Sequence, residues 1–126
     1  MDDVTKPMPD APRLRIRILF EDAMLGPGKA DLLEGIRATG SIAAAGRAMS
    51  MSYKRAWSLV EEMNAAFRAP LVESVRGGAK GGGARLTGTG EAVLAHYRKL
   101  EEIAAEAGAA RLAALRSMLR DIPGKK

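Results

Sequence analysis

The stretch Gly40-Ser-Ile-Ala-Ala-Ala-Gly-Arg-Ala-Met-Ser-Met-Ser-Tyr-Lys-Arg-Ala-Trp57 predicts two short helices joined by a tight turn. Ser41 is a favourable N-cap for a helix that runs to about Met49. Ser52 can cap a second helix over residues 53–67, whose apolar side chains recur at spacings of four, three and four. A three-residue turn between them sets the second helix across the first. This pattern is typical of a helix-turn-helix.

The segments before this stretch predict one strand and one more helix. Residues 14–20 begin with a strict alternation of apolar and basic side chains, which indicates a half-buried strand. Its inward face would carry Leu14, Ile16, Ile18 and Phe20. A break at Gly26-Pro-Gly28 follows, and residues 29–39 then have the apolar spacing of a helix that ends at Gly40.

The segments after it predict a hairpin and a long helix. Pro70 prevents the preceding helix from continuing. Residues 71–75 and 84–87 form two short strands joined by a glycine-rich run, Arg76-Gly-Gly-Ala-Lys-Gly-Gly-Gly83. Thr87 or Thr89 caps a last helix that continues to about residue 121.

The order strand, three helices, hairpin, long helix predicts a mainly α fold with a small β hairpin. We expect a winged helix-turn-helix with an N-terminal strand and a long C-terminal dimerisation helix, because the short helices cannot bury their apolar faces alone. The expected divisions are a flexible tail (1–12), the winged helix-turn-helix domain (13–88), the dimerisation helix (89–122) and a tail (123–126).

Composition narrows the possible functions of this 126-residue, 13.4 kDa chain. It has no Cys and one His, which excludes disulfides, thiolate nucleophiles, zinc fingers and a His-rich metal site. The sequence contains no apolar run long enough for a membrane helix, and the acidic, Pro-rich start does not resemble a signal peptide. We therefore expect a cytoplasmic protein without a membrane partner.

No motif indicates an enzyme. The glycine-rich run fits neither G-x-x-x-x-G-K-[ST] nor G-x-G-x-x-G, and it joins two predicted strands instead of opening a helix. The pairs Glu61 and Glu62, and Glu101 and Glu102, are adjacent and diverge by about 100° on a helix, so neither can form an acid–base pair. We expect no catalytic residue, no metal and no cofactor.

The positive charge is concentrated in the helix-turn-helix and hairpin. Residues 41–90 contain seven Lys or Arg and three Glu, which is +4 of the formal net charge of +5. A flexible basic loop can approach a phosphate backbone without side-chain clash. The alternatives are an ordinary three-helix core with Lys and Arg on its solvated face, and a merely flexible hairpin tip.

Double-stranded DNA is the partner that this pattern favours. The first turn of the helix over residues 53–67 would present side chains to the major groove, and Trp57 fits the core better than the DNA surface. The candidate DNA-binding residues are Ser41, Arg47, Ser52, Tyr53, Lys54, Arg55, Ser58, Arg76, Lys80 and Arg85.

The last helix carries an apolar seam longer than a small domain can cover. Pairing with the same helix of a second copy would bury it. The candidate interface residues are Val93, Tyr97, Leu100, Ala104, Leu112, Leu115 and Leu119. Alternatively the helix lies on its own domain, or it binds another protein, in which case the chain is an interaction module with incidental DNA binding.

Several short motifs together resemble one known family. These are Ser52-Tyr-Lys-Arg-Ala-Trp57, Glu62-Met-Asn64, Pro70-Leu-Val72, Gly77-Gly-Ala-Lys-Gly-Gly-Gly83, Leu86-Thr87, Gly90 and Tyr97-Arg98. Over about residues 13–107 the chain resembles the N-terminal DNA-binding domain of the ModE family of molybdate-responsive transcriptional regulators. The helix-turn-helix also looks, more loosely, like that of LysR-type regulators.

The resemblance implies a homodimer that binds palindromic promoter DNA. Residues 52–55 would open the recognition helix, and Lys80 and Arg85 would belong to the wing. The Ser-Ala-Arg-Asn signature of the family's Mop-type molybdate-binding domains does not occur, so we expect a stand-alone DNA-binding chain. It would bind constitutively, respond through a separate molybdate-binding or other effector protein, or sense a signal at the dimer interface.

Overall fold

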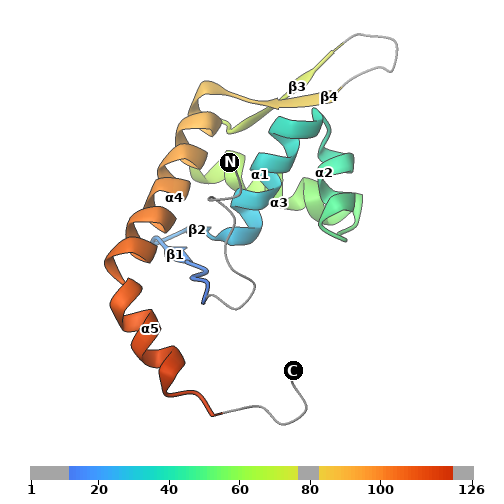
Figure 1. Ribbon diagram of the computed structural model, residues 1–126. Helices are drawn as coiled ribbons and strands as arrows, with labels where there is room; N and C mark the ends of the chain where they lie inside the picture. Colours follow the sequence, from blue (N-terminus) through green and yellow to red (C-terminus); the bar gives the residue numbers. More distant parts are fainter. Residues whose placement is uncertain (1–11, 77–82, 121–126) are drawn as a thin grey trace, which may run out of the picture.

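The computed structural model describes residues 12–76 and 83–120. Within this part of the chain the fold is mainly helical, with two small antiparallel strand pairs (Figure 1). The elements are β1 (Ile18–Leu19), β2 (Met24–Leu25), α1 (Pro27–Thr39), α2 (Ile42–Ala48), α3 (Tyr53–Ala66), β3 (Val72–Val75), β4 (Gly83–Leu86), α4 (Gly88–Ala107) and α5 (Ala109–Ser117). None of these helices is long and apolar enough to cross a membrane.

The predicted caps of α2 and α3 are confirmed. The Ser41 hydroxyl accepts a hydrogen bond from the Ala44 N–H at 3.0 Å, and the Ser52 hydroxyl accepts one from the Arg55 N–H at 3.0 Å. Between the helices, Ser50 has a φ of 60°, a left-handed conformation that is unfavourable for a residue with a Cβ. The chain thus accepts local backbone strain to turn from α2 into α3.

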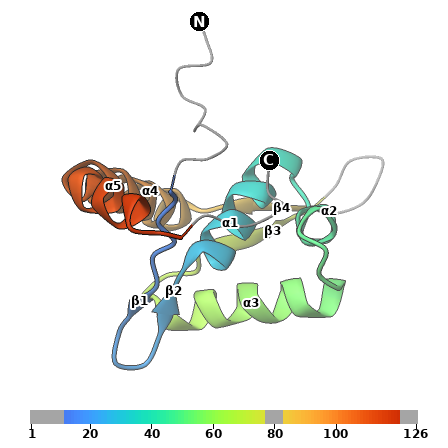
Figure 2. The same cartoon turned by 60° about the horizontal axis from the view of Figure 1, so that its bottom comes forward.

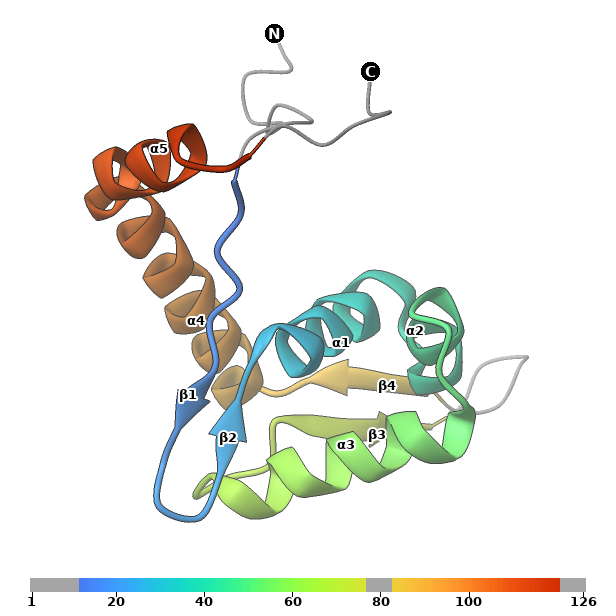
Figure 3. The same cartoon turned by 90° about the horizontal axis from the view of Figure 1, so that it is seen from below.

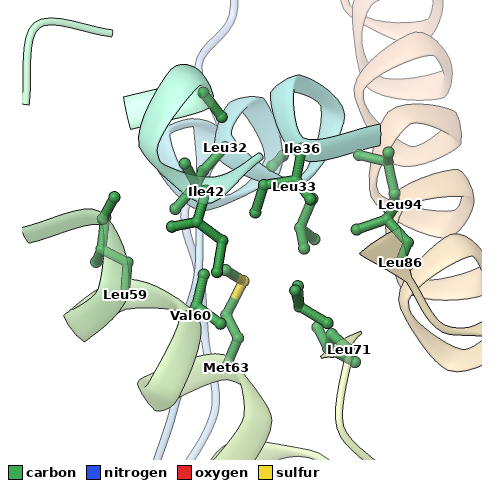
Figure 4. Close-up of a cluster of buried hydrophobic side chains, with 14 of the residues drawn as sticks. Leu32, Leu33, Ile36, Ile42, Leu59, Val60, Met63, Leu71, Leu86 and Leu94 are labelled. Carbon is green, nitrogen blue, oxygen red and sulfur yellow. The ribbon is translucent and has the colours of Figure 1, made fainter. Parts of the chain in front are cut away.

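The core lies where α1 packs against α2, α3, the hairpin and α4. Figure 4 shows apolar side chains converging from these elements. Small residues set the closest approaches: a Cβ on Gly46 would lie 2.9 Å from the Cβ of Ala56 in α3, and one on Gly35 would lie 3.0 Å from that of Ala45. The fully buried larger side chains are Leu32, Leu33, Ile36, Val60, Met63, Leu71, Leu94 and Tyr97.

The β3–β4 hairpin is fixed to the helices at both ends. Near α4, the Asn64 carboxamide of α3 accepts from the N–H groups of Leu71 and Val72 and donates to the Val72 carbonyl. At the other end, the Ala84 N–H donates to the Gly40 carbonyl at 2.9 Å. A Cβ on Gly83 would lie 2.6 Å from that carbonyl oxygen, so only glycine fits there. The hairpin is therefore held by α3 at one end and by the α1–α2 loop at the other, and β4 packs beside α1 (Figure 2).

The N-terminal strand is shorter than predicted. Only Ile18 and Leu19 are in strand conformation, because the chain turns back and pairs with Met24–Leu25, a strand that the sequence pattern did not predict. Residues 12–17 instead run beside α4, where the Tyr97 hydroxyl donates to the Ile16 carbonyl at 2.5 Å. Leu14 and Phe20, expected on the inward face, are exposed.

The prediction of one continuous last helix is wrong. The helix is interrupted at Gly108, and α5 bends away from the axis of α4 (Figure 3). Glycine weakens a helix through its backbone freedom, which explains why the break falls there. The proposed end of this helix near residue 121, the expected tail over 123–126 and residues 1–11 of the expected tail over 1–12 lie outside the described residues.

Candidate nucleic-acid interface

The first turn of α3 presents an exposed polar and basic surface. Tyr53, Lys54 and Arg55 are all exposed, and this turn contains no acidic residue. The N–H groups and the positive end of the helix dipole favour anions at this position. Ser58, one turn further on, is half-buried. The arrangement can hold a phosphate and direct long side chains outward at the same time.

A groove joins this turn to the hairpin. Its volume is about 360 Å³. Its lining residues are Ser41, Ile42, Ala43, Tyr53, Trp57, Ser74, Val75, Arg76, Gly83 and Ala84. The groove brings together Ser41, which caps α2, Tyr53, which begins α3, and Arg76, which follows β3. Its lining includes one cation and no carboxylate, so an anionic ligand would meet no repulsive side chain from this set.

An aromatic pair forms one wall of the groove. The Trp57 indole N–H donates a hydrogen bond to the Tyr53 hydroxyl one helical turn earlier. The two rings meet edge to face, with centroids 6.3 Å apart and planes at 84°. Trp57 is half-buried against the core, whereas Tyr53 is 57% exposed. The prediction that Trp57 is a core residue is therefore confirmed only in part, because its ring packs against the core and also borders the groove.

Of the remaining predicted DNA-binding residues, those in the described part of the chain are exposed. Arg47, in the last turn of α2, and Arg76, directly after β3, are both exposed. The Arg85 guanidinium is bonded to the Glu73 carboxylate across the hairpin at 2.8 Å. Both side chains are solvent-exposed, so this pair contributes at most about 1 kcal/mol and a phosphate can replace the carboxylate. Lys80 lies outside the described residues.

Sequence reasoning missed the residues that position the hairpin. Asn64, Gly40 and Gly83 were not among the candidate binding residues, yet together they fix where the hairpin stands relative to α3 and the α1–α2 loop. The sequence did contain a signal for Asn64, because this polar residue lies four positions after the buried Val60 and shortly before Pro70. Its hydrogen-bond partners, however, cannot be predicted from spacing.

An ion-pair cluster holds α4 against α1. The Arg98 guanidinium bonds to Asp31 at 2.8 Å, to Glu34 at 2.6 Å and to Glu101 at 3.1 Å. Burial opposes the charged form of this guanidinium, but the three carboxylates outweigh it and raise the pKa of Arg98 above its ordinary value. The Tyr97 hydroxyl beside it has a raised pKa, chiefly because of burial and then because of the nearby Glu101.

The predicted dimer seam is divided between core and surface. Tyr97 is 1% exposed and Val93 packs against the core, so both side chains serve this chain's own fold and are not free for a second copy. Ala104 and Leu112 are half-buried. Leu100, Leu115 and Leu119 are exposed, as are Ile103 and Met118, which the predicted seam did not include. Exposed apolar side chains therefore occur in the second half of α4, in α5 and directly after α5.

Within the described residues, no group of three or more His, Cys, Asp or Glu side chains could hold a metal ion. The exposed cations and hydroxyl groups of this interface suit an anionic ligand.

The chain matches no protein family model. It is similar to the molybdenum-pterin-binding protein MopB of Rhodobacter capsulatus, with 46% identity over 79 residues. It is also similar to the molybdenum transport protein ModE of Azotobacter vinelandii, with 46% identity over 70 residues. A third relative is the DNA-binding transcriptional dual regulator ModE of Escherichia coli, with 39% identity over 85 residues.

These similarities cover 63%, 56% and 68% of this chain, respectively. They cover 29%, 26% and 31% of the three relatives, so the chain spans less than a third of the length of each protein it matches. By their names, one of these relatives binds molybdenum pterin, one takes part in molybdenum transport and one is a DNA-binding transcriptional regulator.

Proposed function

We propose that this chain is a ModE-like, sequence-specific regulator of transcription that binds double-stranded DNA. In this proposal α2 and α3 form the helix-turn-helix and β3–β4 forms the wing of a winged helix-turn-helix. The observation that carries it is the groove in which Ser41, Tyr53 and Arg76 meet beside the exposed basic first turn of α3. The similarity to a DNA-binding regulator supports the same reading.

In the proposed mechanism, different residues contact the base edges and the sugar-phosphate backbone. Lys54 and Arg55 project from the start of α3 and would reach base edges in the major groove. The hairpin would follow the adjacent backbone, where phosphate contacts set the register of the protein without reading sequence. The proposed backbone contacts are Ser41, Arg47, Ser52, Tyr53, Ser58, Arg76, Lys80 and Arg85.

We propose that the active form is a homodimer on a palindromic site. The apolar side chains exposed on α4 and α5 would meet their counterparts in a second copy, which would remove them from water. Two recognition helices would then enter successive major grooves, about 34 Å apart.

The exposed apolar surface also favours a second candidate function. The chain could be an interaction module whose α4–α5 surface binds another protein, with DNA binding incidental. Footprinting on genomic DNA separates the two: a protected, palindromic site supports the regulator, and uniform weak protection supports the interaction module.

The names of the relatives are the only indication of an effector for this chain. Their names mention molybdenum transport and molybdenum-pterin binding. We propose that any molybdate response of this chain passes through a separate molybdate-binding or other effector protein, which contacts the DNA-binding unit.

The direct test selects a binding site from a random DNA library and measures its affinity for the Lys54→Ala/Arg55→Ala double variant. Each good base contact discriminates by about 1–3 kcal/mol, so selectivity for the selected site should fall at least about 10-fold while the thermal midpoint is preserved. Glu61→Ala, an exposed change on the same helix, is the matched control. Unchanged selectivity in the double variant would refute the role of α3.

A further inference from the structure

The Tyr53–Trp57 pair carries an inference beyond general DNA binding. We propose that Trp57 is a positioning residue, which holds the Tyr53 hydroxyl as a dedicated hydrogen-bond donor to one DNA backbone phosphate. This role rests on the proposed DNA-binding function. It specifies the donor (the Tyr53 hydroxyl), its acceptor (a phosphate) and the residue that positions the donor (Trp57).

The hydrogen bond between Trp57 and Tyr53 determines where the Tyr53 hydroxyl proton can point. A Tyr hydroxyl has one proton to donate and two lone pairs that can accept. The Trp57 indole N–H, which can only donate, occupies one of these lone pairs. The Tyr53 O–H proton therefore cannot point at the indole and remains available to an outside acceptor.

The packing fixes where that donor stands. Trp57 is half-buried and packs against the core, so its ring provides a rigid support. The edge-to-face contact and the hydrogen bond together hold the Tyr53 ring at two points. Tyr53 itself is 57% exposed, which leaves its hydroxyl accessible at the rim of the groove. A donor held in this way loses little conformational freedom on binding.

The surroundings of the hydroxyl favour a phosphate as its acceptor. The groove that Tyr53 lines also includes the Arg76 side chain and the hydroxyl-bearing Ser41 and Ser74. No carboxylate is among these lining residues. An anionic oxygen placed there would meet donors and a cation at the junction of α3 and the hairpin, where a recognition helix passes the DNA backbone.

A double-mutant cycle tests the role. Tyr53→Phe, Trp57→Phe and the double variant are measured by fluorescence anisotropy against a duplex that the wild type selects from a random library. Loss of a neutral donor to a charged acceptor should weaken binding about 10-fold per subunit, or about 1.4 kcal/mol. Trp57→Phe should cause a similar loss in the wild type and none in the Tyr53→Phe background, because the indole acts through the hydroxyl.

A chemical probe on the DNA identifies the acceptor. Each phosphate near the α3 contact is replaced in turn by a neutral methylphosphonate. At one position the replacement should weaken the wild type more than it weakens Tyr53→Phe, because the variant has already lost the hydroxyl donor to that phosphate. If Tyr53→Phe instead loses discrimination between bases at one position, the hydroxyl reads a base and the assignment to a phosphate is wrong.

Trp57 packs against the core, so each variant's unfolding midpoint is measured alongside its affinity. If Trp57→Phe unfolds, the sulfur isostere benzothienylalanine at the chain's single Trp position removes the N–H and keeps the ring shape. Additive losses in the cycle would show that Trp57 acts by packing. Unchanged affinity of Tyr53→Phe would refute the role of the hydroxyl but not the proposed DNA-binding function. A wild type that binds no duplex would instead refute the proposed function.

Discussion

Asn64 is the residue whose removal should most clearly separate the hairpin from the helices. Its Oδ1 accepts from the Leu71 N–H at 2.8 Å and from the Val72 N–H at 3.1 Å, and its Nδ2 donates to the Val72 carbonyl at 3.1 Å. Leu71 is 0% and Val72 5% exposed, so water does not readily replace the carboxamide in the native state. Asn64→Ala would leave two buried donors and one acceptor without their partner.

The expected cost follows from these bonds. Each buried N–H left unpaired costs about 1–3 kcal/mol, and partial relaxation of the hairpin reduces the sum, so we expect a loss of about 3 kcal/mol in the free energy of unfolding. A small domain has only about 5–15 kcal/mol in total, which makes this change easy to measure.

Urea unfolding followed by circular dichroism measures the loss, with Glu61→Ala as an exposed control on the same helix that should stay within about 0.5 kcal/mol. A loss of less than about 1 kcal/mol for Asn64→Ala, with an unchanged denaturant slope, would refute the role of Asn64 as the anchor of β3.

Three further predictions concern the turn, the α4 contact and the proposed dimer. Ser50→Gly should stabilise the protein by about 0.5–1 kcal/mol, because glycine adopts the φ of 60° without strain; a loss of stability in the same urea assay would contradict this. Tyr97 has a raised pKa in the folded state, so its neutral form contributes stability that is complete below the unfolded pKa of about 10 and is lost as the pH rises through the folded pKa. The wild type should therefore lose more stability than Tyr97→Phe in alkaline urea titrations, and parallel curves would exclude this contribution. Leu115→Glu/Leu119→Glu should convert a dimer to monomers in analytical ultracentrifugation while Ala110→Glu does not, and a dimeric double variant would place the interface elsewhere.

The local features of the fold were predictable from sequence because they depend on residues a few positions apart. The caps Ser41 and Ser52 each accept from an N–H three residues later, and the strands of the β3–β4 hairpin lie next to each other in the chain. The positions of α2 and α3 therefore followed from spacing alone.

The features that sequence reasoning missed depend on distant contacts. Tyr97 has the spacing of an interface residue, yet its hydroxyl reaches Ile16, 81 positions earlier, and its ring completes the core. The groove combines α3 with a hairpin whose placement depends on the close approach of Gly83 to Gly40. Periodicity within one segment contains no information about such pairings.

Salt dependence of DNA affinity is the most direct test of the central claim that the α3 turn and hairpin bind a phosphate backbone. Anisotropy with the selected duplex is measured from 50 to 200 mM salt. If each subunit of the proposed dimer contacts three to five phosphates, about six to ten in total, affinity should fall on the order of 10³–10⁵ across this range. An affinity that stays nearly constant over the same range would contradict the claim.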